Sequence, residues 1–480
     1  MEKESIEEIG IANVHRSFSW SARLLKCMGI WPLKNYVPLF LFFFTYLSLH
    51  CFLTFAHLFL APKTMENVVP NIAENMLITM TLTKITIARM NREALRKLFM
   101  DIKEYSLNEK YETKEEKLTF LHYTKLPPRF IVISACSMTL SDTLYYITRL
   151  ADGIQMAKLN NYTSYQLPYK TLQIIDLSDI RIYALICAYQ ILFVPCVVLG
   201  YVGFDCMFVN LSIQVIAQFS ILSYKVKTVL NNSKNHHEGM KRLVLRHYRL
   251  IRFSEGLEDN FNFVIMQQLL GTTIHICISG YFLMTSPETN DNVTSFLFVV
   301  YIFSVTSTLF IYCFIGECFI QESTNFGNAI YNYEWYDLPA TDSKFFLICM
   351  IRTKKPQFLT SGKFAILSLT VFTDIVKTSM GYLSENKWFA YTSFTYIGVI
   401  KYGKTILIRS IKTFSSFLRE KNLLSNVILL MIIIYSALGA LRTFFRYSSF
   451  GLIKTILRSF FSRLPYSIFH PHSHSCICIR

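Results

Sequence analysis

The stretch "GKFAILSLTVFTDIVKTSMGYL", residues 362–383, combines two properties that rarely occur together. It is long and apolar enough to cross a bilayer, because about 20 mostly apolar residues span the hydrocarbon core. It also carries five Ser and Thr side chains and the ionisable residues Asp374 and Lys377. Such residues are costly at membrane depth unless they face protein or water. The stretch is therefore either a helix buried among other helices or one that borders an aqueous path.

The whole chain has the composition of a membrane protein. Of its 480 residues, 52% are hydrophobic and 17% are charged, and the mean hydropathy is +0.34, whereas about a quarter of residues are charged in soluble domains. The acidic start "MEKESIEEIG" does not resemble a cleavable signal peptide, so we expect the first span to direct insertion. Most cysteines lie in or beside apolar segments, which favours buried thiols over a disulfide framework.

Seven segments have the length and apolar character of spanning helices. They are residues 37–60, 68–88, 130–147, 182–208, 261–283, 296–319 and 362–383. The second and third are the weakest, because Glu74, Lys84 and Asp142 are among the polar residues that interrupt them. The sequence therefore predicts an all-α membrane protein with seven transmembrane helices.

The distribution of basic residues predicts the orientation, since cytoplasmic loops retain Lys and Arg. One set of flanks holds 29 basic residues and the other holds 5. This asymmetry predicts a cytoplasmic N-terminus, the inverse of a G-protein-coupled receptor. The glycosylation sequons at Asn161 and Asn292 both fall in loops assigned to the outside, which agrees with the prediction.

An ordered series of motifs begins near the end of the sixth span. It consists of Tyr312, Cys313 and Gly316, then Tyr331, Trp335 and Tyr336, then Lys355 and Pro356, then Gly362, Lys363 and Phe364, and finally Lys377, Thr378 and Ser379. In this order the series resembles the C-terminal part of insect odorant receptors. The resemblance loosely covers residues 17–384, and the inverted orientation agrees with it.

The resemblance implies a subunit of a ligand-gated, nonselective cation channel, without enzymatic activity or a cofactor. Such subunits form hetero-tetramers with an obligate co-receptor in the plasma membrane of sensory dendrites, and the last helix lines the pore. At about 100° per residue, Thr370, Thr373, Lys377 and Asp374 fall within one broad sector of that helix. Lys377 would raise the barrier to cations unless Asp374, three residues earlier, pairs with it.

The resemblance also divides the chain into regions. Residues 1–36 form a cytoplasmic N-terminal segment and residues 37–384 the membrane domain, with a cytoplasmic anchor at about 319–362 and a pore helix at about 362–383. In the anchor, Tyr331, Trp335 and Tyr336 are expected to pack subunits together. A preference of Tyr and Trp for membrane interfaces explains the same cluster equally well.

The resemblance places the site for a small volatile ligand among the outer halves of the second, third, fourth and sixth spans. Ligand sites are mostly apolar and aromatic with a few polar anchors. The residues that meet this description are Met76, Met80, Tyr145, Tyr146, Tyr183, Tyr189 and Tyr301. Ordinary helix packing would use the same residue types.

Other motifs point to no further chemistry. We find no catalytic, phosphate-binding or metal-binding motif. The basic, histidine-containing run at residues 231–253 fits anchoring to anionic lipid better than nucleic acid or metal binding.

Residues 385–480 form an atypical tail with 13 basic and 2 acidic residues. Its apolar run at 423–441 is long enough for an extra helix. We favour a read-through or gene-model artefact over such an eighth helix.

Two other functions fit a multi-span chain. A gustatory receptor would share the architecture, but the sequence lacks the Thr-Tyr-x-x-x-x-x-Gln-Phe ending that is typical of that family. A membrane transporter often shows internal repeats, and none is evident here.

Overall fold

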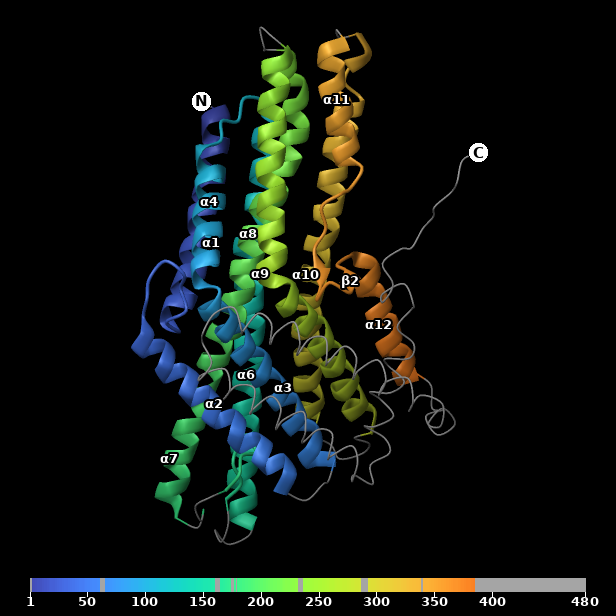
Figure 1. Ribbon diagram of the computed structural model, residues 1–480. Helices are drawn as coiled ribbons and strands as arrows, with labels where there is room; N and C mark the ends of the chain where they lie inside the picture. The colour runs from blue at the N-terminus through green and yellow to red at the C-terminus, as the bar shows by residue number, and fades with distance from the viewer. Residues whose placement is uncertain are drawn as a thin grey trace.

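The computed structural model describes residues 2–60, 65–159, 165–173, 177, 179–231, 236–285, 292–337 and 340–384. Within these residues the chain is a bundle of helices with one short β-hairpin (Figure 1). The tail at 385–480, with its candidate eighth helix, lies outside the described residues.

The helices coincide with the predicted spans. In chain order they are α1 (Glu2–Cys27), α2 (Val37–Leu60), α3 (Met65–Met90), α4 (Arg92–Asn108), α5 (Lys114–Thr124), α6 (Leu126–Leu159), α7 (Ile180–Ile191), α8 (Phe193–Asn231), α9 (His236–Thr285), α10 (Asn292–Tyr331), the 3-10 turn η1 (Trp335–Asp337), α11 (Ala340–Thr353) and α12 (Leu369–Ser384). The first predicted span is α2, the next five lie within α3, α6, α7 with α8, α9 and α10, and the seventh overlaps α12. The all-α prediction is confirmed.

Five helical stretches in the described part of the chain are long and apolar enough to cross a membrane. They are Val37–Leu60, Lys114–Leu159, Ile180–Thr228, His237–Gly280 and Phe298–Tyr331. The stretches that contain the second and seventh predicted spans are not among them. The polar side chains of α3 and the 16-residue length of α12 explain this difference.

The fourth predicted span is divided between two helices that meet at Leu192. Pro195 has no N–H to donate to the carbonyl of Ile191, and its ring crowds that carbonyl. The chain therefore bends between α7 and α8. By contrast, α9 runs without a break for 50 residues.

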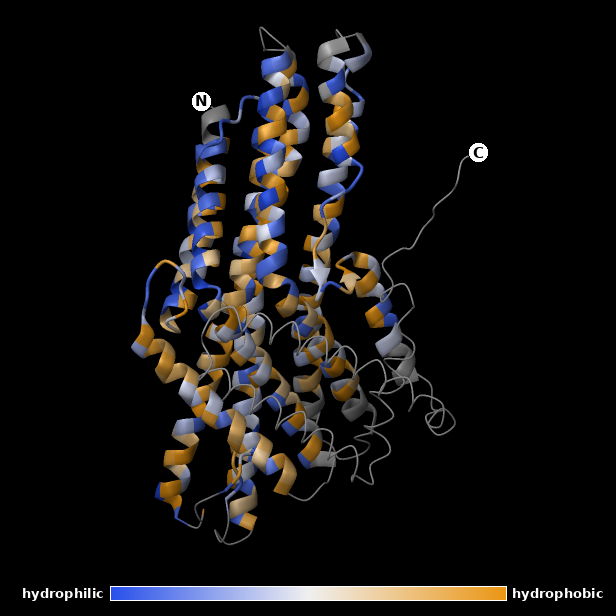
Figure 2. Ribbon diagram, in the orientation of Figure 1, coloured by the Kyte–Doolittle hydropathy of each residue, from blue (hydrophilic) through white to orange (hydrophobic). Residues whose placement is uncertain are grey.

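The two ends of the bundle differ in polarity. The N-terminus, α4, α11 and the adjoining parts of α8, α9 and α10 lie at the upper end in Figure 1, whereas α2, α3, α6 and α7 occupy the lower part. Figure 2 shows many hydrophilic residues on the upper helices and mostly hydrophobic ones below. One apolar core runs through both parts, from Val14 and Phe18 of α1 to Ile375 of α12. The N-terminal helix is thus an integral part of the bundle.

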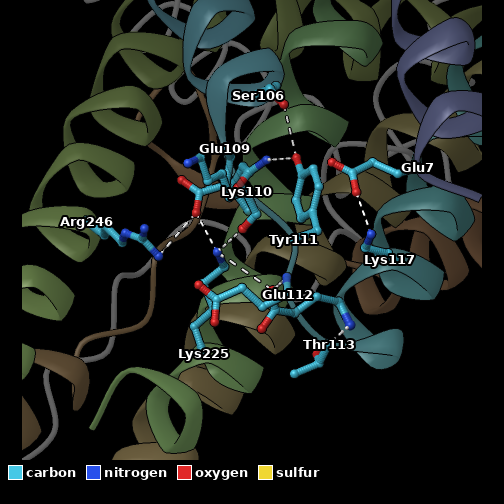
Figure 3. Close-up of polar contacts among 12 residues, drawn as sticks. Glu7, Ser106, Glu109, Lys110, Tyr111, Glu112, Thr113, Lys117, Lys225 and Arg246 are labelled. Carbon is cyan, nitrogen blue, oxygen red and sulfur yellow. Dashed lines mark hydrogen bonds and ion pairs between the residues drawn. The ribbon is translucent and has the colours of Figure 1, made fainter. Parts of the chain in front are cut away.

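A buried ionic cluster ties the connection between α4 and α5 to α8 and α9 (Figure 3). Lys225 Nζ lies 2.6 Å from Glu109 Oε1 and 3.7 Å from Glu116 Oε2, and an Arg246 guanidinium nitrogen lies 3.1 Å from the same Glu109 oxygen. The Tyr111 hydroxyl accepts a hydrogen bond from Gln218, and burial raises the Tyr111 pKa well above its ordinary value. The two cations and two carboxylates are paired with one another, so this cluster has a structural role.

The start of the predicted pore helix is corrected by the structure. The helix was expected from about residue 362, but α12 begins at Leu369. Before it, β1 (Thr360–Ser361) pairs antiparallel with β2 (Ala365–Ile366). The turn between the strands places Gly362 and Lys363 at φ angles of 59° and 64°. A left-handed Gly–Lys pair closes a hairpin and does not start a right-handed helix.

Candidate functional site

The polar face predicted for α12 is present on the helix. Thr370, Thr373 and Lys377 are exposed in the isolated chain, whereas Val371 and Ile375 are buried against the bundle. The helix packs on α9 and α10 and is otherwise uncovered by the described residues. Its hydrophilic side therefore points away from the chain's own core.

Asp374 is half-buried, and no ion pair joins it to Lys377 in the described residues. From the sequence, such a pair was the condition under which Lys377 would not raise the barrier to cations. The lysine charge on the exposed face is thus not neutralised from within this part of the chain.

The hairpin before α12 is held by two helices. Glu258 of α9 accepts hydrogen bonds from the backbone and hydroxyl of Thr360, with an N–O distance of 2.8 Å for the first. Glu317 of α10 accepts from the Leu369 N–H at 3.2 Å. These contacts satisfy backbone donors that would otherwise be left unpaired. They fix the position from which α12 departs.

Gly316 lets this hairpin approach α10. A Cβ atom at this position would overlap the carbonyl oxygen and the Cβ of Leu367. Leu367 in turn donates its N–H to the carbonyl of Leu359 at 2.9 Å. The glycine of the Tyr-Cys-x-x-Gly motif is therefore required by a close backbone contact.

The tyrosine of the same motif belongs to a buried ionic network that joins α3, α8, α9 and α10. Lys84 Nζ lies 2.7 Å from Asp205 Oδ1, and both side chains are fully buried. The Tyr312 hydroxyl donates to the same Asp205 oxygen at 2.7 Å, and Lys84 also donates to Gln268 at 2.9 Å. The ring of Tyr201 lies 3.3 Å from the ammonium group. A charge pair with these partners is tolerated inside an apolar bundle.

A second group of polar side chains, the tyrosine–acid cluster, comes from α3, α6, the segment before α7, α9 and α10. It consists of Glu74, Asp142, Tyr145, Tyr169, His275 and Tyr301. The Tyr145 hydroxyl donates to Glu74 Oε1 at 2.7 Å, and the Tyr145 and Tyr169 rings are 5.9 Å apart. The Tyr301 hydroxyl lies 2.5 Å from His275 Nδ1. Both carboxyl groups act electrostatically on Tyr169 and on Tyr301, which places the six residues in one neighbourhood.

The structure separates the residues predicted to bind a ligand. Tyr145 and Tyr301 belong to the tyrosine–acid cluster. Tyr146 donates its hydroxyl to the Cys187 carbonyl at 2.8 Å, and Tyr183 donates to the Gln166 carbonyl at 3.2 Å. The last two hydroxyl groups are thus occupied by the protein backbone.

The remaining three predicted residues lie elsewhere. Met76 packs on a small apolar cluster that includes Leu58 and Ile278. Met80 is buried against Gly271 of α9. The ring of Tyr189 lies 5.1 Å from that of Tyr46.

Sequence analysis missed Glu74, Asp142 and His275 as site residues. The two acids were treated only as interruptions of apolar segments. An ionisable residue within a span is itself a signal for a functional interior. The sequence did not show that these side chains are buried on helices that face one another.

The aromatic residues predicted as a subunit anchor lie at the end of α10 and in the turn that follows it. Tyr331 and Tyr336 are 66% and 68% exposed, and Trp335 is half-buried. The rings of Trp335 and Tyr336 are 6.2 Å apart in an edge-to-face arrangement. The chain therefore presents these aromatic side chains on its surface.

Two other predictions concern modification and metals. Asn161 lies outside the described residues, and Asn292 is the first residue of α10. Among the residues that the structure describes, no group of His, Cys, Asp and Glu side chains is arranged to hold a metal ion.

Comparison with known proteins gives consistent results. The model of the 7tm Odorant receptor family matches residues 64–380. Odorant receptor 13a of Drosophila melanogaster is 27% identical over 225 residues, which is 42% of this chain and 50% of that protein. The Odorant receptor coreceptor of Ooceraea biroi is 26% identical over 143 residues, covering 30% of each chain. The matches span about half, or less, of these relatives.

The fold is that of a solved insect receptor. The olfactory receptor OR5 from Machilis hrabei superposes with a TM-score of 0.68 at 14% identity, covering 78% of this chain and 98% of that one. The same receptor in complex with eugenol superposes with a TM-score of 0.63, covering 79% and 96%. Identity at this level supports a shared fold alone.

Proposed function

Because the chain belongs to the 7tm odorant receptor family, we propose that it is an odorant-tuning subunit of a ligand-gated, nonselective cation channel. It is a multi-pass membrane protein of receptor type and not an enzyme. In this proposal it forms a hetero-tetramer with an odorant receptor co-receptor in the plasma membrane of a sensory dendrite. The names of the relatives, which include receptors and co-receptors, support this assignment.

One observation carries the channel proposal. The face of α12 that holds Thr370, Thr373 and Lys377 is hydrophilic and is not covered by the helices that the structure describes. A polar helix face is costly in lipid but stable beside water. An assembly that turns these faces toward a common axis gives them an aqueous environment, and half-buried Asp374 borders the same path. We propose the N-terminus in the cytoplasm and Asn161 and Asn292 as the external glycosylation sites.

The ligand in this proposal binds at the tyrosine–acid cluster, where helices α3, α6, α9 and α10 meet. A mixture of aromatic rings and a few polar groups is typical of small-molecule sites. Tyr145 and Tyr301 are the predicted ligand residues that lie there. The cluster and the Lys84–Asp205 network share α3, α9 and α10. Because α12 packs on α9 and α10, we propose that ligand binding at the cluster acts on α12 through these two helices.

Whole-cell recording tests the proposal. Cells that express the chain with a co-receptor are exposed to a broad panel of volatile compounds that includes eugenol, the ligand of the Machilis receptor. We expect ligand-evoked cation current only when both proteins are present. A chain ending at Ser384 is compared with the full-length chain. Silence across the panel, with both proteins detected at the cell surface, would refute the assignment.

A second measurement tests the orientation. An epitope tag before Met1 is expected to become accessible to antibody only after the cells are permeabilised. Labelling of intact cells would contradict the cytoplasmic N-terminus.

A further inference from the structure

The acidic residue of α6 faces the inside of the bundle. Ile133, Leu140 and Ile147 recur every seven residues and are more than half exposed, so they mark the outward face of the helix. Asp142 lies on the other face and is 9% exposed. This residue is therefore enclosed by protein and does not reach the bundle surface.

Asp142 has no partner in the part of the chain that the structure describes. Its Oδ2 atom is fully buried and makes no hydrogen bond, and the residue takes part in no ion pair. Buried polar groups in native proteins are almost always paired, and a buried carboxylate is especially costly when it is not. The hydrogen-bonding capacity of Asp142 is therefore free for a partner that is not among these residues.

Two neighbours in the tyrosine–acid cluster have similar free positions. Glu74 accepts from Tyr145 through Oε1, but its Oε2 atom is buried without a partner. His275 faces Tyr301 through Nδ1, and its buried Nε2 is likewise unpaired. These three unpaired polar atoms come from three helices, in a neighbourhood that holds three tyrosine rings, and they are the positions at which a polar guest could bond.

The balance of charge selects the chemistry of that guest. The positive charges of Arg149 and Lys170 act on Glu74 and partly compensate it. Asp142 takes part in no ion pair among the described residues. Burial without a partner disfavours its charged form, and an ammonium group is a partner that stabilises that form. The surrounding rings of Tyr145, Tyr169 and Tyr301 add faces on which a cation is stabilised.

We propose that the ligand of this site is an amine with an apolar body, and that Asp142 receives its ammonium group. This inference rests on the proposed function, because it names the ligand class of the same site. The ammonium group donates to Asp142, and the apolar body lies against the aromatic rings. A neutral alcohol of the same shape lacks the charge and binds less tightly.

Matched ligand pairs test the inference in cells that express the full chain with a co-receptor. The pairs are 2-phenylethylamine with 2-phenylethanol, and cyclohexylamine with cyclohexanol. We expect the amine of at least one pair to activate at a concentration roughly tenfold lower than its alcohol. The reason is that a charge-assisted hydrogen bond is stronger than a neutral one. The Asp142→Asn variant is expected to lose this preference, so that the amine and its alcohol activate at similar concentrations.

Asp152→Asn is the matched control. It removes the same charge from the same helix, but at a half-exposed side chain that lies 3.8 Å from Arg149. We expect it to retain the preference for the amine. Surface biotinylation of each variant shows whether a lost response reflects a lost protein.

The outcomes separate this inference from the proposed function. If alcohols activate the channel as well as or better than amines, the amine site is refuted and the channel assignment stands. The same holds if Asp142→Asn keeps the preference for the amine. Silence to all four compounds and to the wider panel, with both proteins at the surface, refutes both.

Discussion

At the scale of residues, the bundle contains buried charges of two kinds. Lys84 and Asp205 are fully buried and neutralise each other at 2.7 Å, with Tyr312 as a further partner. Asp142 is buried without any such partner among the described residues. Since removing one member of a buried ion pair strands the other, the first kind supports the fold. The second kind is available to a ligand.

The paired kind leads to a stability prediction. We expect Lys84→Met to lower the free energy of unfolding by about 3–5 kcal/mol, because Asp205 is left charged and unpaired. The double variant Lys84→Met, Asp205→Leu is expected to be more stable than Lys84→Met alone. Thermal melting of the detergent-solubilised protein measures both effects. A double variant less stable than the single one would show that the pair is not the relevant unit.

The charge on α12 leads to a conduction prediction. At about 10 Å in water, one lysine raises the energy of a passing cation by about 0.4 kcal/mol, which corresponds to roughly a twofold change in local cation concentration. We therefore expect Lys377→Gln to increase single-channel cation conductance. Lys363→Gln makes the same charge change at the exposed hairpin turn and serves as the control. An unchanged conductance in Lys377→Gln would place this face away from the ion path.

At the scale of elements, apolar length predicted helices at five of the seven spans most directly, because hydrocarbon imposes that length. The predicted spans at α3 and α12 also contain helices, but these are more polar or shorter. The β-hairpin was missed since two-residue strands have no periodicity, and the Gly362–Lys363 turn was taken as the start of a helix. The break at Leu192 was also missed, although Pro195 was visible. Most of the tyrosine–acid cluster could not be predicted, because helix rotation and the pairing of α3 with α6 and α9 arise from packing.

Gly316 provides a prediction at this scale. Gly316→Ala places a methyl group on the backbone of Leu367, so the hairpin must move and α12 with it. Overpacking of this kind lowers the free energy of unfolding by about 1–3 kcal/mol. We expect reduced surface expression, and a loss of ligand-evoked current that exceeds the loss of surface protein. Gly256→Ala is the control, since its methyl group meets only the flexible end of Leu98 at 3.0 Å. Equal currents in the two variants would contradict this role of Gly316.

Introduced cysteines can map the exposed face of α12 once the accessible native cysteines have been replaced. Cys27 and Cys136 are the exposed cysteines among the described residues, and these should be replaced by serine, together with Cys476 and Cys478 of the tail. Cys349 can remain, because burial raises its pKa to about 11 and keeps it protonated at neutral pH. In this background we expect Thr373→Cys to react with aqueous reagents and Ile375→Cys to resist them.

At the scale of the whole molecule, the chain presents two surfaces that are suited to contact with other subunits. One is the polar face of α12, and the other is the aromatic group after α10. Tyrosine is enriched at protein interfaces relative to the rest of a protein surface. Their position beyond the end of α10 fits the predicted anchor between subunits.

The aromatic surface predicts the behaviour of the assembly. We expect the double variant Tyr331→Ala, Tyr336→Ala to co-purify less with the co-receptor. Truncation of an interface hot spot costs about 2 kcal/mol of binding free energy. Tyr248→Ala on α9 is a suitable control, since this tyrosine is 59% exposed. The stability of the chain itself should not change. Full co-purification by the double variant would assign these rings to the membrane interface.

The unbroken course of α9 has a mechanical consequence. At 1.5 Å per residue, its 50 residues form a rod about 75 Å long. A rotation of one degree about one tip displaces the other tip by about 1.3 Å, given that length. The chain is interrupted at Leu192 between α7 and α8, whereas α9 continues as one helix. His275 lies near the C-terminal end of α9. A bound ligand that displaced this side chain and tilted the helix would therefore also displace the far end of α9.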